Sequence, residues 1–388
     1  MTFTRRRLLK GFGAVVGLGN FSGALEGCSF LRLKTDLASD LYRQPEEQKD
    51  QENKQQPAHR QPLALPDDQS DPPPKNSDVT NPQEISIDRL VQDGPLKGLD
   101  PTRNIVYIAL DIERLFGLPV PSEAYHTIDA IREAAASTII PEQQPEAKLR
   151  ALDSILNDKF KFKLTGKIDL LTGDIKDQVT TLGEGLGLEK WQLDCDTSSI
   201  LFIGIGEDLG WPVQGVRVPY HFFVRWALSD KEAHPFHPYI NWDTVNRDKF
   251  MDLAYWVNYR VNKSARDSGM YMKSLAREQT ISTIFEQVGR ALRRKDDYEK
   301  AVDAYSRAIA LDDTNVFAWI NRGDSFTQLK RYNEAVASFL EAAKRDPTLF
   351  ESYRGLAFAY QQQGRQKDAE EAAKTAEQMW NQWHRLGS

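Results

Sequence analysis

The chain has 388 residues, 40% of them hydrophobic, and a formal net charge of −6, so it can form two or three domains with packed cores. The mild negative charge argues against a general nucleic-acid-binding protein. Beyond the N-terminus no run of about 18 or more apolar residues occurs, so no later segment is expected to span a membrane.

Residues 1–28 are expected to be an export signal. TRRRLLKG, residues 4–11, resembles the twin-arginine signal, with Arg5 and Arg6 as the pair. A short, weakly apolar run follows and ends in LEGC, which resembles the box where lipoproteins are cleaved and lipidated, here at Cys28. The alternative for Cys28 is an ordinary residue near a cleavage site. We therefore expect a periplasmic protein of the cell envelope, anchored to the membrane through Cys28.

Residues 29–84 are expected to form a disordered tether. The segment is rich in Gln, Pro and charged residues and poor in aromatic residues, so it cannot bury enough surface to offset its ordering entropy. The chain has two cysteines, and in an oxidising compartment a disulfide between Cys28 and Cys195 is one alternative. If Cys28 is instead lipidated or removed, Cys195 is expected to be a single thiol.

Residues 85–275 are expected to form one α+β domain. Apolar residues recur at helical spacing in residues 104–121, 122–139 and 146–164, so three helices are predicted there. Gly117 and Pro119 end the first, and the third runs into a short apolar end. A fourth, buried helix is predicted from Cys195, because residues 200–205 are nearly all apolar and DCDT before them favours a helix start.

The predicted position of Cys195 at a helix N-terminus has two opposing consequences. The helix dipole and the free N–H groups stabilise a thiolate there, and the same N–H groups are candidate oxyanion donors. Asp194 and Asp196 act in the other direction, because nearby carboxylates raise the pKa of a thiol unless they point outward.

Two strands are predicted after this helix, in WPVQGVRVP and YHFFVRW, with a bend at Pro219. Successive side chains of a strand point to opposite faces, so the second strand has two sets of side chains, one on each face. The first set is His221, Phe223 and Arg225; the second is Phe222, Val224 and Trp226. YINWDT, residues 239–244, is predicted to be a third strand, where an acidic side chain can orient the imidazole of His221.

Cys at a buried helix start, LGWPV, a His before alternating apolar residues and then WDT resemble the transglutaminase-like superfamily, which shares its core with papain-like cysteine proteases. The resemblance implies that Cys195 is the nucleophile, His221 the base and Asp243 the carboxylate that orients it. Tyr220 stands where many relatives have Gly, and it either narrows the acyl site or supplies a hydroxyl to it. A second oxyanion donor often lies upstream of the nucleophile.

That upstream position makes Trp191 and Gln192 candidates for the second donor. Each catalytic candidate also has a structural alternative: a small core residue for the cysteine, a core histidine for the histidine, and a cap after the strand for the aspartate. His234 and His237, with His221, allow a zinc site, but prolines place that pair in a loop. No metal and no other cofactor is expected.

The rest of the chain repeats with a period of 34 residues. Aligned positions are Tyr298, Tyr332 and Gln366; Ala301, Ala335 and Ala369; Ala308, Ala342 and Ala376; Phe285, Trp319 and Tyr353; and Gly289, Gly323 and Ala357. This pattern resembles the tetratricopeptide repeat, and three units are predicted over residues 282–383. Such stacks bind an extended peptide or a partner helix, so a protein or peptide partner is expected. The alternative is that the repeats only cap the preceding domain.

The sequence thus predicts an exported cysteine-dependent acyl-transfer enzyme, a hydrolase of amides or peptides or a transamidase, with a repeat module for partner or substrate. The alternative is a non-catalytic transglutaminase-like interaction scaffold of the cell envelope. Neither prediction involves nucleic acid.

Overall fold

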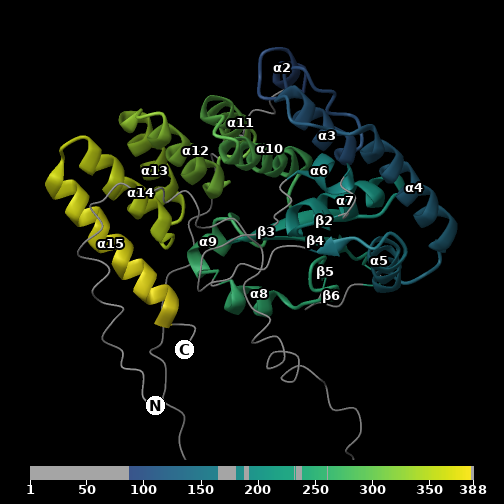
Figure 1. Cartoon of the computed structure of the whole chain (residues 1–388). Helices are drawn as coiled ribbons and strands as arrows, with labels where there is room; N and C mark the ends of the chain where they lie inside the picture. Colours follow the sequence, from purple (N-terminus) through teal and green to yellow (C-terminus); the bar gives the residue numbers. More distant parts are fainter. Residues whose placement is uncertain are drawn as a thin grey trace, which may run out of the picture.

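The computed structural model describes residues 87–164, 181–187, 192–230, 232, 238–259 and 261–385 (Figure 1). The predicted export signal, the lipidated Cys28 and the tether lie outside these residues, as do Trp191, His234 and His237. No helix in the described part is both long and apolar enough to span a membrane.

Helices and two very short strands form the first part of the fold. They are α2 (Ile87–Gln92), α3 (Ile105–Leu115), α4 (Ser122–Thr138), α5 (Pro145–Ser154), the π-helical turn η1 (Ile155–Lys159), β1 (Lys163–Leu164), α6 (Leu182–Gly187) and β2 (Gln192–Leu193). The three helices predicted here are present, and the third ends at Lys159, before the short apolar end of its segment. Near this end the Asn157 side chain donates to the carbonyl of Asp153 at 3.0 Å, a bond that competes with the regular helical ladder.

A buried helix and a four-stranded antiparallel sheet follow. The helix is α7 (Cys195–Asp208), and the strands are β3 (Val213–Val218), β4 (His221–Ala227), β5 (Tyr239–Asp243) and β6 (Asp248–Lys249), in the order β3-β4-β5-β6. Two short helices, α8 (Asp252–Asn258) and α9 (Lys263–Asp267), come next. The predicted helix from Cys195 and the three predicted strands are therefore confirmed. We call α2 to α9 the sheet region.

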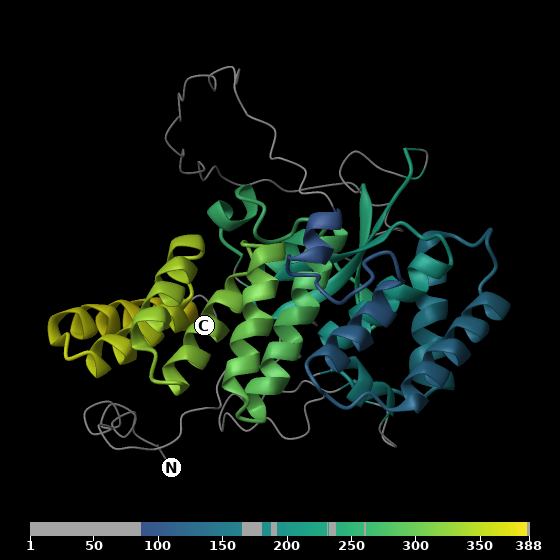
Figure 2. The ribbon, with the colours of Figure 1, turned by 90° about the horizontal axis from the view of Figure 1, so that it is seen from above.

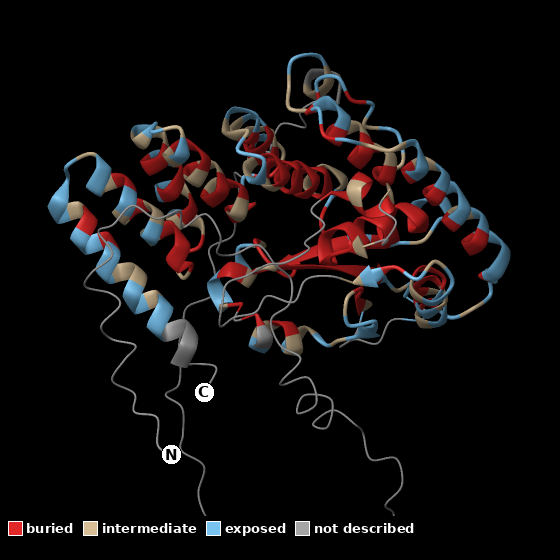
Figure 3. Cartoon of the chain, in the orientation of Figure 1, coloured by how far each residue is buried: buried red, intermediate tan, exposed pale blue. Residues whose placement is uncertain are grey.

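β4 is buried along its length up to its last residue, Ala227 (Figure 3). Phe222, Val224 and Trp226 belong to the same apolar cluster as the buried side chains of α7. On the opposite face Phe223 stacks on Tyr255 of α8 with ring centroids 3.9 Å apart. The predicted alternation is present, and each face has its own covering helix.

Six helices arranged as three hairpins form the C-terminal part, which we call the repeat module. They are α10 (Arg277–Arg294), α11 (Tyr298–Leu311), α12 (Val316–Gln328), α13 (Tyr332–Arg345), α14 (Phe350–Gln362) and α15 (Gln366–Arg385). The predicted spacing of small and large residues has a physical cause here. A Cβ added at Gly323 would lie 2.7 Å from the ring of Phe339, so only Gly allows α12 and α13 to approach this closely.

The repeat module packs against the sheet region (Figures 1 and 2), where α10 and α11 lie between the other repeats and α3. The guanidinium of Arg217 on β3 pairs at 2.9 Å with Asp312, between α11 and α12, and both side chains are buried. The hydroxyl of Tyr271 donates to Asp346, between α13 and α14, at 3.0 Å. Two of the three turns that join successive helices from α11 to α14 therefore supply a carboxylate to residues that precede the repeat module.

Candidate active site

His221 and Asp243 form a buried pair at one end of the sheet. His221 begins β4 and Asp243 ends the antiparallel neighbour β5, so both lie at the same end. Nε2 of His221 is 2.8 Å from Oδ2 of Asp243. The other carboxylate oxygen accepts from the backbone N–H groups of Val245 and Asn246 at 3.1 and 2.9 Å. The carboxylate is thus held from both sides.

The charge state of Asp243 follows from these contacts. Burial by itself raises the pKa of Asp243, but the charge of His221 and hydrogen bonds from His221 and Asn246 outweigh it. The net pKa of Asp243 is lowered, so the carboxylate stays ionised at neutral pH. An ionised acceptor at Nε2 fixes the orientation and the tautomer of the imidazole.

Aromatic rings surround His221. Its ring stacks on Tyr259 with centroids 4.9 Å apart and planes 3° from parallel, and Tyr255 lies at 6.2 Å. Nδ1 of His221 is buried and has no hydrogen-bond partner in the described part of the structure. Because Nε2 is bonded to Asp243, Nδ1 is the ring nitrogen left for proton transfer.

Cys195 is the first residue of α7, as predicted. Asp194 caps the helix: its side chain accepts from the N–H of Thr197 at 2.8 Å, and the Thr197 hydroxyl accepts from the N–H of Asp194 at 2.8 Å. Cys195 is fully buried. Its sulfur is disulfide-bonded in the structure, and the only other cysteine of the sequence, Cys28, lies outside the described residues.

Two serines on α7 place Cys195 relative to the His221–Asp243 pair. Ser198 and Ser199 follow Cys195 by three and four residues and therefore lie on its face of the helix. The Ser199 hydroxyl donates to the carbonyl of Phe222 at 3.2 Å, and the Ser198 hydroxyl lies 2.6 Å from that of Thr244. Phe222 and Thr244 directly follow His221 and Asp243 along the chain. Cys195 is thus one helical turn from contacts with the neighbours of both residues.

The two aspartates beside Cys195 are buried and do not point outward. Burial and the charge of Asp196 raise the pKa of Asp194 to about 6, against the lowering effects of Arg290 and the cap hydrogen bonds. Asp196 forms an ion pair with Arg290 of α10, and both side chains are 11% exposed. Both carboxylates disfavour a thiolate at Cys195, and the positive charge of Arg290 in the repeat module partly compensates for this effect.

Tyr220 connects the end of the sheet with the repeat module. It adopts a φ of 60°, in the left-handed region that Gly enters without cost and that a bulky side chain rarely adopts. Its hydroxyl donates to the carboxylate of Glu351 on α14, and its ring lies 5.0 Å from that of Phe317 on α12. Gln192 lies three residues before Cys195, on β2, where its backbone is in register with that of Lys163 on the parallel strand β1.

Sequence reasoning missed Arg290, Phe317 and Glu351. They lie in the repeats, 94 or more residues from their partners Asp196 and Tyr220. No local pattern identifies them, because each belongs to an ordinary repeat helix.

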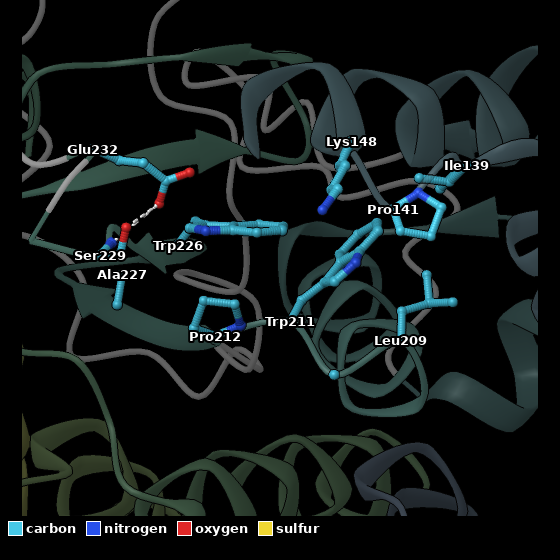
Figure 4. Close-up of a pocket in the computed structure, with 11 residues that line it drawn as sticks. Ile139, Pro141, Lys148, Leu209, Trp211, Pro212, Trp226, Ala227, Ser229 and Glu232 are labelled. Atoms are coloured by element: carbon cyan, nitrogen blue, oxygen red, sulfur yellow. Dashed lines mark hydrogen bonds between the residues drawn. The ribbon is translucent and has the colours of Figure 1, made fainter. Parts of the chain in front are cut away.

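Two cavities lie away from these residues. One of about 330 Å³ is found at the other end of α7, where Trp211 and Trp226 meet with ring centroids 5.2 Å apart beside Lys148 (Figure 4). A second of about 430 Å³ lies beside Trp256 and Arg266. Neither is lined by the predicted catalytic residues. In the described part of the chain no group of three or more His, Cys, Asp or Glu side chains is arranged to hold a metal ion.

Comparison with known families identifies the repeats. A family described as "Tetratricopeptide repeat" matches residues 283–315, and one described as "TPR repeat" matches residues 323–364. The chain therefore contains tetratricopeptide repeats, as predicted from the period of 34. Arrays of this kind are protein-interaction modules.

Curated relatives share only a limited part of their length with this chain. The small glutamine-rich tetratricopeptide repeat-containing protein 2 of Saccharomyces cerevisiae is 38% identical over 88 residues, which cover 23% of this chain and 25% of that protein. The Hsp70-Hsp90 organizing protein 1 of Arabidopsis thaliana is 31% identical over 78 residues, which cover 20% and 14%. The chain spans a quarter or less of the length of these two relatives.

Two solved structures are also similar over part of the chain. MamA is 21% identical over 27% of this chain and 61% of that chain, with a TM-score of 0.26. The second TPR of Spaghetti bound to an HSP90 peptide is 21% identical over 26% and 94%, also with a TM-score of 0.26.

Proposed function

We propose that this chain is a cysteine-dependent acyl-transfer enzyme with a transglutaminase-like domain and a repeat module that binds a protein partner. The observation that carries the proposal is the buried pair of His221 and Asp243. Ionisable groups are costly to remove from water, and buried pairs of this kind concentrate at functional sites. The pair also leaves Nδ1 of His221 unpaired at the end of the sheet where α7 begins.

The proposed reaction requires Cys195 in its reduced form. The thiol gives its proton to Nδ1 of His221, and the thiolate attacks an amide or ester carbonyl carbon. The imidazolium then protonates the leaving amine or alcohol, and a thioester remains on Cys195. Water or an acceptor amine loses a proton to His221 and attacks the thioester, which releases the acyl product and restores the thiol. Asp243 stays ionised throughout and stabilises the imidazolium.

The backbone N–H groups at the start of α7 are the proposed oxyanion donors, because they precede the first helical hydrogen bonds and carry the positive end of the dipole. Gln192 is proposed as the second donor. Either water or an amine fits as final acceptor, so the proposed activity covers both hydrolysis and transamidation.

One observation favours a second function, a non-catalytic scaffold. Cys195, His221 and Asp243 are 0%, 4% and 1% exposed, and Cys195 is disulfide-bonded. A closed site with an oxidised sulfur fits a structural role as well as a resting enzyme.

Alkylation of Cys195 separates the two functions. In a Cys28→Ser background Cys195 is the only thiol, so its reaction with iodoacetamide is measured as a function of pH in the reduced, folded chain. The enzyme predicts an apparent pKa well below the free-thiol value of about 8.5, which returns towards that value in His221→Ala. An ordinary pKa that is indifferent to His221 supports the scaffold. With an amide substrate, Cys195→Ala must lose all turnover.

We also propose that the chain is an envelope lipoprotein attached through Cys28, a form in which Cys195 is reduced, because a lipidated sulfur cannot form a disulfide with it. The support is the TRRRLLKG and LEGC segments of the sequence. Cys28→Ser should then appear in the soluble fraction of the envelope and lose incorporation of a labelled fatty acid. Unchanged membrane retention and labelling would contradict the anchor.

A further inference from the structure

Arg290 is the charged group that the repeat module brings to the start of α7. Its guanidinium forms an ion pair with the carboxylate of Asp196, the residue directly after Cys195. The other oxygen of that carboxylate, Oδ1, lies 3.7 Å from Sγ of Cys195. A carboxylate at this distance, 11% exposed, acts strongly on any charge that develops on the sulfur.

Arg290 is held in place within the repeats. Its Nε lies 3.3 Å from Glu286, one turn earlier on α10. Glu286 in turn accepts from the side-chain amide of Asn321 on α12 at 2.7 Å. The position of the guanidinium therefore depends on the packing of α10 against α12.

We propose that the repeat module completes the site through Arg290, a positioning residue that neutralises Asp196 and so keeps the reduced Cys195 thiol reactive near neutral pH. The proposal deepens the proposed function and rests on it for its biological meaning. It assigns to the repeats a part in the chemistry in addition to the binding of partners.

The other titratable groups at this end of the fold are fixed by contacts of their own. They are Asp194 at the cap of α7, His221 on β4, Asp243 on β5, Tyr255 and Tyr259 in and after α8, and Glu286 on α10. Asp194 and Asp196 both oppose a thiolate, and their mutual repulsion contributes to the raised pKa of Asp194. Arg290 is a cation that pairs with Asp196 and lowers the pKa of Asp194, so its loss removes a positive charge that acts on both carboxylates.

The test measures alkylation of Cys195 against pH in the reduced, full-length Cys28→Ser chain. Arg290→Met keeps much of the side-chain volume and removes the charge. The apparent pKa of the thiol should rise by about one unit, which is about tenfold slower alkylation well below the pKa. In the double variant Arg290→Met with Asp196→Asn, the carboxylate that required neutralisation is gone, and the pKa should return to the starting value.

Arg293→Met is the matched control. Arg293 lies on the same helix and pairs with Asp324 of α12 at 2.9 Å, so its loss disturbs the same helix pair without removing the partner of Asp196. The control should leave the alkylation profile unchanged. Circular dichroism and thermal unfolding of each variant verify the fold.

The outcomes are separable. An unchanged profile in Arg290→Met overturns the proposal, and so does a shift that Asp196→Asn fails to reverse, because Arg290 would then act only on the fold. If Arg290→Met does not fold, Asp196→Asn alone decides: with Arg290 present, loss of the carboxylate must lower the thiol pKa, and a pKa that stays or rises overturns the proposal. If the proposed function itself is wrong, the apparent pKa of the Cys195 thiol will be the same in the His221→Ala variant as in the parent chain.

Discussion

The repeat module and the sheet region place their buried ionisable groups differently. Between helices of the repeats small residues lie beneath aromatic rings, such as Gly323 beneath Phe339, and the buried carboxylates Asp312 and Glu351 face Arg217 and Tyr220 of the sheet region. The sheet region buries ionisable groups: Asp243 beside His221, and Glu113, which accepts from the N–H groups that begin α6. Burial raises the pKa of Glu113 to about 8 despite these bonds. The apolar contacts stabilise the fold, whereas the ionisable ones cost stability and mark where chemistry is expected.

The two regions nevertheless share one core. Val216 and Val218 of β3 belong to the same apolar cluster as Val316 and Ile320 of α12. An array of repeats that contacts only its own neighbours unfolds unit by unit. Because this array also shares a cluster with a sheet, we expect the two regions to unfold together.

The largest effect is expected from Phe339→Ala. The ring is fully buried and fills the space beside two glycines, Gly323 and Gly355. Its loss should lower the free energy of unfolding by about 3–5 kcal/mol. Urea unfolding should show one transition by both far-UV circular dichroism and hydrogen exchange in β4. Melting of the repeats while β4 stays protected would show that the shared core does not couple the regions.

A buried ion pair between the regions gives the second effect. Arg217→Met leaves Asp312 buried without its cation, and both side chains are 6% or less exposed. The cost should be about 3 kcal/mol, measured by urea unfolding at pH 7. Adding Asp312→Asn should recover more than half of this loss, since the uncompensated charge is then removed. If the double variant is as unstable as the single one, packing and not charge explains the effect.

Local elements of both regions were predictable from the sequence, and the contacts between the regions were not. The helix start at Cys195 is determined by the residues of the first turn, and the strand from His221 by the alternation of its side chains. The repeats are recognisable because the same residue types recur every 34 residues. The pairs Asp196–Arg290 and Arg217–Asp312 join residues 94 and 95 apart. Each partner looks like an ordinary polar residue of its own element, because periodicity does not reveal which polar position is covered by another part of the chain.

The third prediction concerns Glu351, whose buried carboxylate accepts from Tyr220. Burial raises its pKa from 4.5 to about 7, despite the opposing hydrogen bond. A raised pKa means that the folded chain binds the proton more tightly, so this contribution to stability is complete below about pH 4.5 and is lost as the pH rises through 7. Glu351→Gln keeps an acceptor and removes the titration.

Thermal or urea unfolding between pH 5 and 8 measures this difference. The stability of the variant should fall less than that of the parent chain over this range, by on the order of 2 kcal/mol. Glu334→Gln is the control, because Glu334 lies on the neighbouring helix α13 and pairs with Arg331 at the surface. Equal pH profiles for the parent chain and Glu351→Gln would show that Glu351 is ionised in the folded chain.

The smallest effect on stability is expected from the loss of a single helix cap, which can be compared between the two regions. Asp297 caps α11 in the repeat module, where its side chain accepts from the N–H of Lys300 at 3.3 Å, in an exposed position. Asp194 has the same role in the sheet region, but its cap bond to the N–H of Thr197 is 2.8 Å long and buried. Asp297→Ala should cost only about 0.5–1 kcal/mol, because water replaces the lost acceptor, and Asp297→Asn should restore most of it.

Neither substitution at Asp297 should change the pH profile of Cys195 alkylation, because the cap is separate from the contacts of Arg290. Asp194→Ala should cost about 2 kcal/mol, since the N–H of Thr197 then remains buried without an acceptor. It should also shift the alkylation profile, because it removes one of the two carboxylates beside the thiol. Equal costs for the two caps would contradict the distinction, since burial of the donor would then make no difference to the value of a cap.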